Sequence, residues 1–409
     1  MALEIKRNTL VKYTPEDGEK IVTVPESVTK IAEHAFGNLF FEDAELEEVI
    51  LPESLKLIDN WAFNGSSIRR MTIPENVKKI EQGAFKDCRN LEYIQFPEKG
   101  CSLNWSTLSG CISLKEAVLP SDMKIIPQEF MRECEKIESV SIPDSVVGIG
   151  KSAFSGCKNL KNFKMPEKLE AVYDYAFSGC ESLKKIVFSK NLNRIGVRSF
   201  YHCNQLETVE VQSKKISSIG HACFYYTPLK EITLPQNTNQ IWDYAFPDGT
   251  LLHFRLPEGN FNIRFNISDW KDRQDEEYLL AFLCDDSVYT SSMDILKSRE
   301  EIFQAIKKGN YKFLLAVFMM QYHPESELYQ AYVKRNIKKI MKLLIDTQDS
   351  GAVQNILDTG YITKKNIDEF INYALENQKH EMQILLMNWK HENIKTESIE
   401  KQVQKKFKL

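Results

Sequence analysis

The chain has 409 residues, of which 43% are hydrophobic and 27% are charged, and its formal net charge at pH 7 is −4. This composition is typical of a folded protein, and the charge gives no reason to expect a nucleic-acid partner. No run of 18 apolar residues is present, so we expect no membrane insertion. The first twenty residues lack the apolar core of a signal peptide, which favours the cytoplasm.

Residues 1–24 are predicted to form an N-terminal capping hairpin. Apolar residues from Leu3 to Tyr13 precede an Asp17-Gly18 turn signal, and Ile21 to Val24 follow it. Such a hairpin would cover the apolar core that the first unit of a repeat array leaves open.

From residue 25 to residue 257 one pattern returns every 22 to 24 residues. A proline or its substitute opens each copy, at Pro25, Pro52, Pro74, Pro97, Pro120, Pro143, Pro166, Ser189, Gln212 and Pro235. An aromatic or its substitute follows 10 to 12 residues later, at Phe36, Phe63, Phe85, Leu108, Phe130, Phe154, Phe177, Phe200, Phe224 and Phe246. Ten coils are therefore expected.

Each coil is predicted to hold one short strand. Between the aromatic and the next proline runs Leu-x-x-Ile-x-Ile, whose last apolar pair alternates with polar residues as in a half-buried strand. The rest of the coil is then a proline turn and an irregular or singly helical back. Stacking at roughly 4.8 Å per coil would form one parallel sheet and place the Phe side chains on top of one another in the core.

Six cysteines recur at 23-residue intervals: Cys88, Cys111, Cys134, Cys157, Cys180 and Cys203. Metal ligands come as paired Cys and His residues around one point, whereas these lie in a line without His. We therefore expect reduced, buried thiols, which fit a reducing compartment. Cys101, Cys223 and Cys284 lie off this ladder, and a thiol reagent is expected to label at most these three in the native protein.

Two coils depart from the pattern. The first carries an insertion with Phe40 and Phe41, which is expected to bulge from one edge. The coil from Pro97 to Leu119 lacks the aromatic at Leu108. The favoured interpretation is that Trp105 fills the space left by the missing Phe, and the alternative places Cys101 and Trp105 in a pocket.

The unit Pro-x-x-Val-x-x-Ile-x-x-x-Ala-Phe-x-x-Cys-x-x-Leu-x-x-Ile-x-Ile, best seen from Pro143 to Leu183, resembles the BspA-like class of leucine-rich repeats. The resemblance covers roughly Ile21 to Pro257. It implies an α/β repeat protein, a leucine-rich-repeat solenoid with its parallel sheet on the concave face. Proteins of this class serve as adhesins and as binding scaffolds.

After the array the periodicity changes. Residues 258–294 are predicted to form a C-terminal cap and connection, with a strand or hairpin around Phe261 to Ile267. Residues 295–409 follow helical spacing, which predicts an all-α helical-repeat domain. Val353/Ile356/Leu357 and Met382/Leu385/Leu386 repeat one spacing, which weakly resembles ankyrin-type helix pairs. Lysines and arginines from Lys334 to Lys342 are interpreted as a solvated face rather than a nucleic-acid site.

The sequence contains no His-Glu-x-x-His pair, phosphate-binding loop or Gly-x-Ser-x-Gly elbow. Cys223 with His221 is the nearest candidate for a thiol nucleophile and its base, and it is weak because nothing else makes that site electropositive. We therefore expect no enzyme, no cofactor and no metal. A less favoured alternative is an enzyme with its site in the helical domain.

The expected function is protein–protein interaction through the concave face of a monomeric scaffold, with a protein or peptide as partner. Strand positions on that face mix both charge signs with polar and apolar residues, which suits a protein better than a polyanion. The candidate partner-binding residues are Glu48, Arg70, Tyr93, Gln95, Glu116, Asn162, Lys164, Lys185, Glu210 and Glu231. The alternative is a secreted or cell-surface adhesin whose export signal is absent from this chain.

Coils seven to ten carry large aromatics outside the core positions: Tyr173, Tyr175, Tyr201, Tyr225, Tyr226, Trp242 and Tyr244. An exposed strip of this size needs a covering. The favoured prediction is that the helical domain covers it, because the segment from Phe261 to Trp270 is a short connection. The alternative is an outside ligand.

Overall fold

The computed structural model describes residues 2–16, 18–37, 46–236, 238, 240–256, 259–265, 279–280, 283, 299–307 and 309–394. The chain divides into two compact units, Met1–Leu296 and Lys297–Leu409. The finer boundaries that the sequence suggests for a capping hairpin, a solenoid, a connection and a helical domain stay predictions. The insertion with Phe40 and Phe41 lies outside the described residues.

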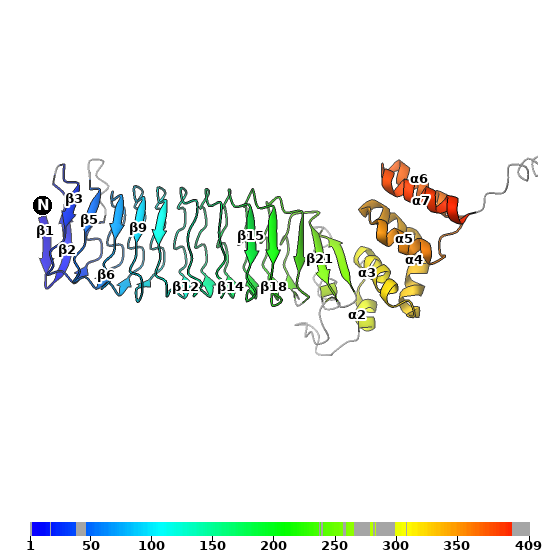
Figure 1. Cartoon of the computed structure of the whole chain (residues 1–409), viewed down its shortest axis with the longest axis horizontal. Helices are drawn as coiled ribbons and strands as arrows, with labels where there is room; N and C mark the ends of the chain where they lie inside the picture. Colours follow the sequence, from blue (N-terminus) through cyan, green and yellow to red (C-terminus); the bar gives the residue numbers. More distant parts are fainter. Residues whose placement is uncertain are drawn as a thin grey trace, which may run out of the picture. The chain divides into compact units, whose positions relative to one another are not determined.

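The first unit is a β-solenoid of about ten coils, and its coils stack side by side along one axis (Figure 1). One strand of each coil belongs to what we call the front sheet: β3 (Ile21–Thr23), β5 (Glu48–Ile50), β7 (Arg70–Thr72), β9 (Tyr93–Gln95), β11 (Glu116–Val118), β15 (Lys185–Phe188), β17 (Thr208–Val211), β19 (Glu231–Leu234) and β21 (Leu251–Arg255). Paired neighbours are parallel and join residues about one repeat apart, such as Glu116 with Tyr93, but β17 and β19 are not paired with each other.

A second, two-residue strand in each coil forms the back sheet: β4 (Lys30–Ile31), β6 (Leu57–Ile58), β8 (Lys79–Ile80), β10 (Ser102–Leu103), β12 (Ile125–Ile126), β13 (Gly148–Ile149), β14 (Ala171–Val172), β16 (Arg194–Ile195), β18 (Ser218–Ile219) and β20 (Gln240–Ile241). The prediction of one strand and an irregular or helical back was therefore wrong. Two residues are too few to show alternation in a sequence, and only pairing with the next coil makes them strands.

The core aromatics stack as the repeat predicts. Ring centroids lie 5.3 Å apart between Phe154 and Phe177 and 5.2 Å apart between Phe177 and Phe200, with nearly parallel planes. All three side chains are fully buried. Leu108 takes the inward position in the coil that lacks a Phe and is also fully buried.

The N-terminal hairpin exists, but its turn is not at Asp17-Gly18. Strands β1 (Ala2–Lys6) and β2 (Thr9–Thr14) pair antiparallel around Arg7 and Asn8. Both turn residues have positive φ, as a two-residue hairpin of this kind requires. The segment after Gly18 instead forms β3, which pairs in parallel with β5.

At the other end of the solenoid the predicted strands are present. Strand β21 pairs in parallel with β19, and β22 (Asn260–Arg264) pairs antiparallel with β21. Phe261 and Ile263 of β22 are buried, as their alternation with polar residues predicts.

The second unit contains the helices α2 (Arg299–Ala305), α3 (Gly309–Tyr322), α4 (Glu327–Thr347), α5 (Ser350–Asp358), α6 (Ile367–Glu376) and α7 (His380–Asn393). Helix α4 packs on α5, and α6 packs on α7. The two segments of repeated spacing lie on α5 and α7, so each contacts the helix that precedes it. Val353 and Leu386 are fully buried in these contacts. The likeness to ankyrin-type pairs stays a prediction.

The front sheet is interrupted, which the sequence does not indicate. Residues 139–141 and 162–164 occupy strand positions but form only one isolated bridge, between Ser139 and Asn162. The back strands β12, β13, β14 and β16 of the same coils stay paired without a break. The coils are therefore held together here by the back sheet and the core rather than by front-sheet hydrogen bonds.

Candidate binding surfaces

The face that the sequence predicts as concave is the outer face of the front sheet, which we call the front face. Eight of the ten candidate residues on it are exposed: Glu48, Arg70, Glu116, Asn162, Lys164, Lys185, Glu210 and Glu231. Tyr93 and Gln95 are half-buried. The cause is local: the Tyr93 hydroxyl donates to Gln95 Oε1 at 2.9 Å, and the Arg70 guanidinium lies 5.8 Å from the Tyr93 ring centre.

The structure links some of these residues into pairs and leaves others apart. Lys185 Nζ lies 2.5 Å from Glu210 Oε1 across two neighbouring coils. Glu231 Oε2 lies 3.5 Å from His253 Nε2. Within the described part of the chain, the carboxylate of Glu116 has no ion-pair partner. The candidates therefore form a row along the solenoid rather than one converging site.

In the part of the chain that the structure describes, the front face has at least three grooves. The largest of these three measures about 680 Å³ and lies between β11 and residues 139–144, at one interruption of the sheet. A second, of about 460 Å³, is lined by residues from Asn162 to Glu167 and from Lys185 to Ser189, at the other interruption. Lost strand pairing thus coincides with the two grooves.

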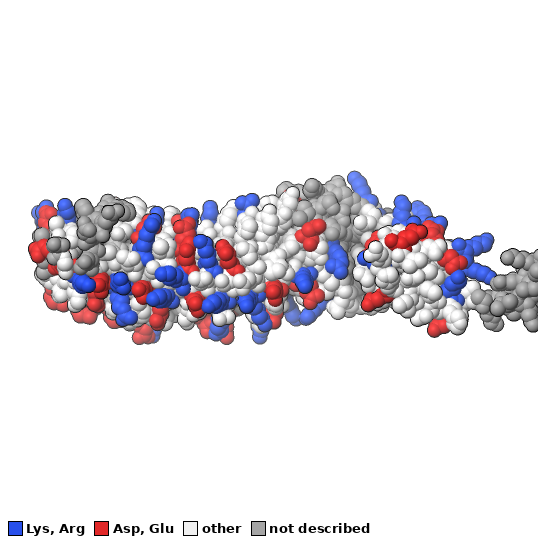
Figure 2. Space-filling view, turned by 90° about the horizontal axis from the view of Figure 1, so that it is seen from above, with Lys and Arg blue, Asp and Glu red and all other residues white. Residues whose placement is uncertain are grey.

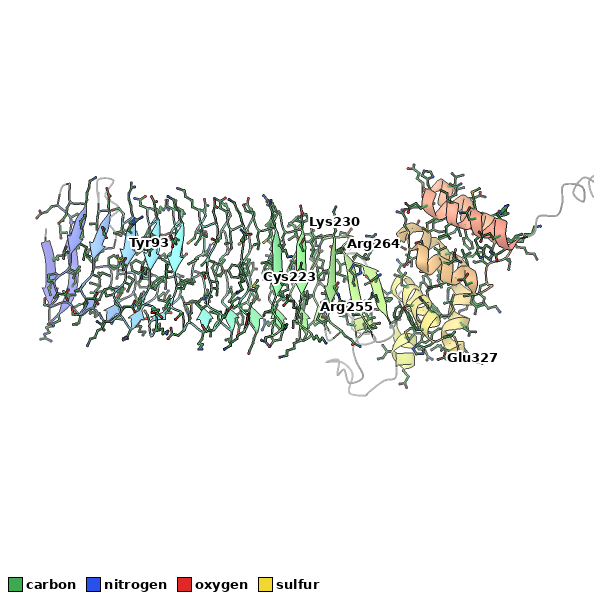
Figure 3. The ribbon with its side chains drawn as sticks, viewed as in Figure 1. Tyr93, Cys223, Lys230, Arg255, Arg264 and Glu327 are labelled. Carbon is green, nitrogen blue, oxygen red and sulfur yellow. The ribbon has the colours of Figure 1, made fainter. Side chains whose placement is uncertain are left out.

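The third groove, of about 430 Å³, lies at the end of the front sheet and brings in residues that the sequence analysis missed. His253 and Arg255 of β21 and Asn260 of β22 line it beside Glu210 and Glu231. Arg255 is labelled in Figure 3. Buried and exposed residues alternate along β21, so the sequence pattern could have shown that the front face extends past the last repeat.

Charges on the solenoid are neutralised from coil to coil. Lys115 Nζ lies 2.6 Å from Glu92 Oε2, and Lys158 Nζ lies 2.7 Å from Glu135 Oε1, each pair one repeat apart. Figure 2 accordingly shows acidic and basic side chains interspersed along the solenoid. Such a surface offers no extended patch of one sign to a polyanion.

The cysteine ladder is buried and reduced. All six ladder cysteines are fully buried and free, and each thiol donates to a carbonyl oxygen of the preceding coil at 3.1 to 3.3 Å. Burial raises the pKa of Cys157 to about 12, so its thiol stays protonated at neutral pH.

The off-ladder cysteines are not all accessible. Cys223 is fully buried beside Ser199, and burial raises its pKa to about 12, so we expect it to resist thiol reagents in the native protein (Figure 3). A raised pKa is also the opposite of what a thiol nucleophile needs, and the ring of His221 instead contacts Tyr244. Cys101 is half-buried, and Cys284 lies outside the described residues.

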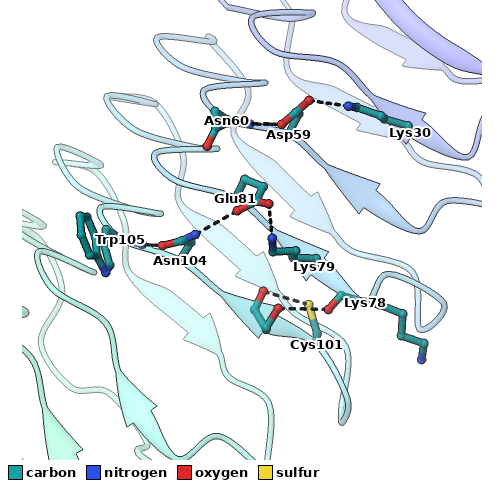
Figure 4. Close-up of polar contacts among 10 residues, drawn as sticks. Lys30, Asp59, Asn60, Lys78, Lys79, Glu81, Cys101, Asn104 and Trp105 are labelled. Atoms are coloured by element: carbon teal, nitrogen blue, oxygen red, sulfur yellow. Dashed lines mark hydrogen bonds and ion pairs between the residues drawn. The ribbon is translucent and has the colours of Figure 1, made fainter.

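The irregular coil is joined to its neighbours by polar contacts (Figure 4). Asn104 Nδ2 donates to Glu81 Oε2 at 2.9 Å, and Glu81 also pairs with Lys79. Trp105 is 55% exposed, so it does not fill the place of the missing Phe; Leu108 does. Trp105 occupies a position at which other coils carry outward polar residues, and neither it nor Cys101 lines one of the three grooves.

The aromatic strip (Tyr173, Tyr175, Tyr201, Tyr225, Tyr226, Trp242 and Tyr244) includes rings in mutual contact. Tyr225 contacts both Tyr226 and Tyr244, at 4.3 and 5.5 Å between centroids. Tyr173 and Tyr226 stay 43% and 52% exposed. The prediction that the helical domain covers this strip is not tested by these contacts and stays a prediction.

In the second unit the basic cluster on α4 meets acidic residues on α6. Lys338 and Lys342 lie 2.7 and 3.6 Å from the carboxylate of Glu369, which lowers the pKa of Glu369. Among the residues that the structure describes, no group of three His, Cys, Asp or Glu side chains could hold a metal ion. No described helix is long and apolar enough to cross a membrane.

A comparison with family models matches the BspA type leucine rich repeat region, in six copies, over residues 18–138 and 124–253. A leucine-rich repeat protein of Bacteroides ovatus is 27% identical, with 54% of this chain and 68% of that chain covered and a TM-score of 0.42. A leucine rich repeat protein of T. pallidum is 25% identical, with 48% and 82% covered and a TM-score of 0.37. A search of curated proteins gave no match. Because the family model spans residues 18–253, more than half of the sequence, the chain belongs to the BspA-type leucine-rich repeat family.

Proposed function

We propose that this chain is a non-enzymatic scaffold that binds a protein or peptide along the front face of its solenoid. The observation that carries the proposal is the coincidence of exposed mixed side chains and grooves on that one face, where three grooves open between neighbouring coils. Strands that repeat about every 4.8 Å hold these residues in fixed positions before binding, so little conformational entropy is lost when a partner binds.

The chemistry of the grooves supports a protein or peptide over a small metabolite. The largest groove joins apolar Val118 and Leu119 to polar Ser139, Ser141 and Glu116. It is open along the face, whereas small-molecule sites enclose most of their ligand. Val118 is 41% exposed, which gives a partner an apolar contact between charged positions.

The absence of an activity is part of this proposal. The buried thiols with raised pKa lack the electropositive surroundings that a nucleophile needs. We further propose that the chain is a monomer and acts in the cytoplasm. A cell-surface adhesin is the second candidate, because buried protonated thiols would also survive outside the cell. Fractionation of the source cell with an antibody to the solenoid distinguishes the two locations.

The test is affinity capture from the source cell with the full chain and with a front-face variant, Arg70→Ala/Tyr93→Ala/Lys164→Ala/Lys185→Ala. The variant should fold, because these side chains lie at the surface or half-buried, and it should lose the partner. A matched control, Lys30→Ala/Lys158→Ala, changes two lysines that line none of the three grooves and pair with Asp59 and Glu135. Equal capture by all three proteins contradicts the proposal.

A further inference from the structure

The aromatic strip contains two arginines that the sequence analysis did not single out. The guanidinium of Arg198 lies 5.9 Å from the ring centre of Tyr175 and 5.2 Å from that of Tyr201. Arg194 lies on the back strand β16, four residues before Arg198, and its guanidinium is 6.0 Å from the ring centre of Tyr173. Repeat spacing is the signal that finds Arg198, because it stands 23 residues after Tyr175.

Within the described residues these arginines lack the acidic partner that several, but not all, lysines of the solenoid have. Lys115, Lys158 and Lys185 each lie within 2.7 Å of a glutamate one repeat away. Within the described ranges neither Arg194 nor Arg198 has an ion-pair partner, and the Nε of Arg198 is buried without a hydrogen-bond acceptor. The nearby carboxylate of Asp174 accepts from the amide of Val197 at 2.9 Å instead. Arg198 Nη1 donates to the Tyr175 hydroxyl at 3.5 Å, which holds the guanidinium in the strip. The strip therefore offers positive charge that no carboxylate neutralises.

The rings add to this preference for an acceptor-rich ligand. Tyr201 meets Tyr226 at 75°, and Tyr225 meets Tyr244 at 77°, so the rings lock one another edge to face. Ring edges carry the positive end of the aromatic quadrupole, and phenol hydroxyls donate hydrogen bonds. Ring edges, hydroxyls and guanidinium groups together attract carboxylates. A carbohydrate would instead stack on the open face of an aromatic ring, and these rings cover one another's faces.

Two members of the cluster occupy backbone positions that favour glycine. His202 and Tyr226 have φ values of 57° and 61° at a turn position that repeats along the solenoid. At that position the other coils carry Gly65, Asp87, Gly110, Glu133, Gly156, Gly179 and Gly249. A bulky residue at positive φ costs stability that glycine avoids. Their rings stack at 4.5 Å and are exposed, so the strain is not compensated by burial.

We infer that the aromatic strip, with Arg194, Arg198 and His202, is a second binding surface that takes an acidic peptide segment of a partner protein. Tyrosine and arginine are the side chains that dominate protein interfaces, and guanidinium groups bind carboxylates in two-pronged hydrogen bonds. The surface is separate from the front-face residues of the proposed function, because it lies on the back strand β16 and on the turns that follow the back strands β14, β16, β18 and β20.

The test is fluorescence anisotropy of labelled deca-glutamate, with deca-glutamine and deca-lysine as controls, added to the full chain. Deca-glutamate alone should bind, and its binding should weaken sharply between about 50 mM and about 500 mM salt. Arg194→Gln/Arg198→Gln should weaken it by about tenfold or more. If the double variant fails to fold, the single variant Arg194→Gln replaces it, because it changes only one exposed residue and should still weaken binding.

Tyr226→Gly separates binding from folding, with Glu133→Gly as its matched control at the same turn position. Both changes remove a side chain from a positive φ, so neither should lower the melting temperature. Only Tyr226→Gly should weaken deca-glutamate binding. Equal binding of deca-glutamine, unchanged binding by the arginine and Tyr226 variants, or binding of a sulfated oligosaccharide in place of deca-glutamate would each overturn the inference.

Discussion

The thiol of Cys157 donates a hydrogen bond to the carbonyl oxygen of Met131, 3.2 Å away and 26 residues earlier in the chain. The same contact recurs at each ladder cysteine, so the sulfur adds a second hydrogen bond to a buried carbonyl; Met131 O, for example, also accepts from the amide of Cys134 at 3.2 Å. Cys157→Val keeps the bulk but loses the thiol donor and should lower the free energy of unfolding by about 0.5–1.5 kcal/mol. Cys157→Ser, which keeps a donor, is the control in urea denaturation. Equal stability of the Val variant and the wild type would show that the contact contributes nothing.

Thiol labelling should follow burial rather than position on the ladder. In native protein, Cys157, Cys180 and Cys223 should stay unlabelled by a thiol reagent until the chain unfolds, because all three are fully buried. Mass spectrometry of the labelled peptides reads out each site. Rapid native modification of Cys157 or Cys180 rules out the buried ladder.

Cys101 should react slowly and with an unusual pH dependence. Burial raises its pKa to about 12, so the thiolate fraction at pH 8 is smaller than for a free thiol with a pKa of about 8.5. A higher pKa means that the rate keeps rising with pH through pH 10. Iodoacetamide labelling of the Cys101 peptide from pH 7 to pH 10 gives the profile. A plateau near pH 9 contradicts the raised pKa.

The phenylalanine stack should be the most sensitive part of the core. Phe154 contacts the rings of Phe177 and Phe163, so Phe154→Ala opens a cavity that its neighbours share. We expect a loss of about 3–5 kcal/mol in the free energy of unfolding. Trp105→Ala, at an exposed aromatic, should change it by less than about 0.5 kcal/mol. Similar losses for both variants would mean that the stack has no special role.

Removing the C-terminal helical domain tests whether that domain or an outside partner covers the aromatic strip. If the strip serves a partner, a chain cut after Asp269 should keep the melting temperature of the solenoid and bind no more hydrophobic dye than the full chain. The favoured interpretation of the sequence, in which the helical domain covers the strip, expects a lower melting temperature and more dye binding. Differential scanning fluorimetry measures both, and the second result contradicts the inference of a partner surface.

The repeat made most of the first unit predictable. Proline, aromatic and cysteine positions recur at a fixed interval, so the coil count and the inward residues, such as Phe154 and Cys157, follow from the sequence. The back sheet does not, because a pair such as Leu57 and Ile58 becomes a strand only through its neighbours in adjacent coils.

The candidate sites were predictable only in part. Alternation places Glu116 on the front face, but residues 139–141 alternate in the same way and still lack strand pairing, so the grooves could not be foreseen. In the hairpin, Arg7-Asn8 forms the turn without the glycine that marks most two-residue turns. The sequence analysis did not single out Arg198, because its proposed role depends on contacts with rings in two different coils, those of Tyr175 and Tyr201.

The front face as partner surface is tested most directly by hydroxyl-radical footprinting of the captured complex. Tyr93 on β9 and Val118 on β11 are both accessible in the free chain, as is Trp105, which lies off the front face. Oxidation of Tyr93 and Val118 should fall when the partner binds, while that of Trp105 should stay the same. A complex in which Tyr93 and Val118 oxidise as fast as in the free chain would contradict the account.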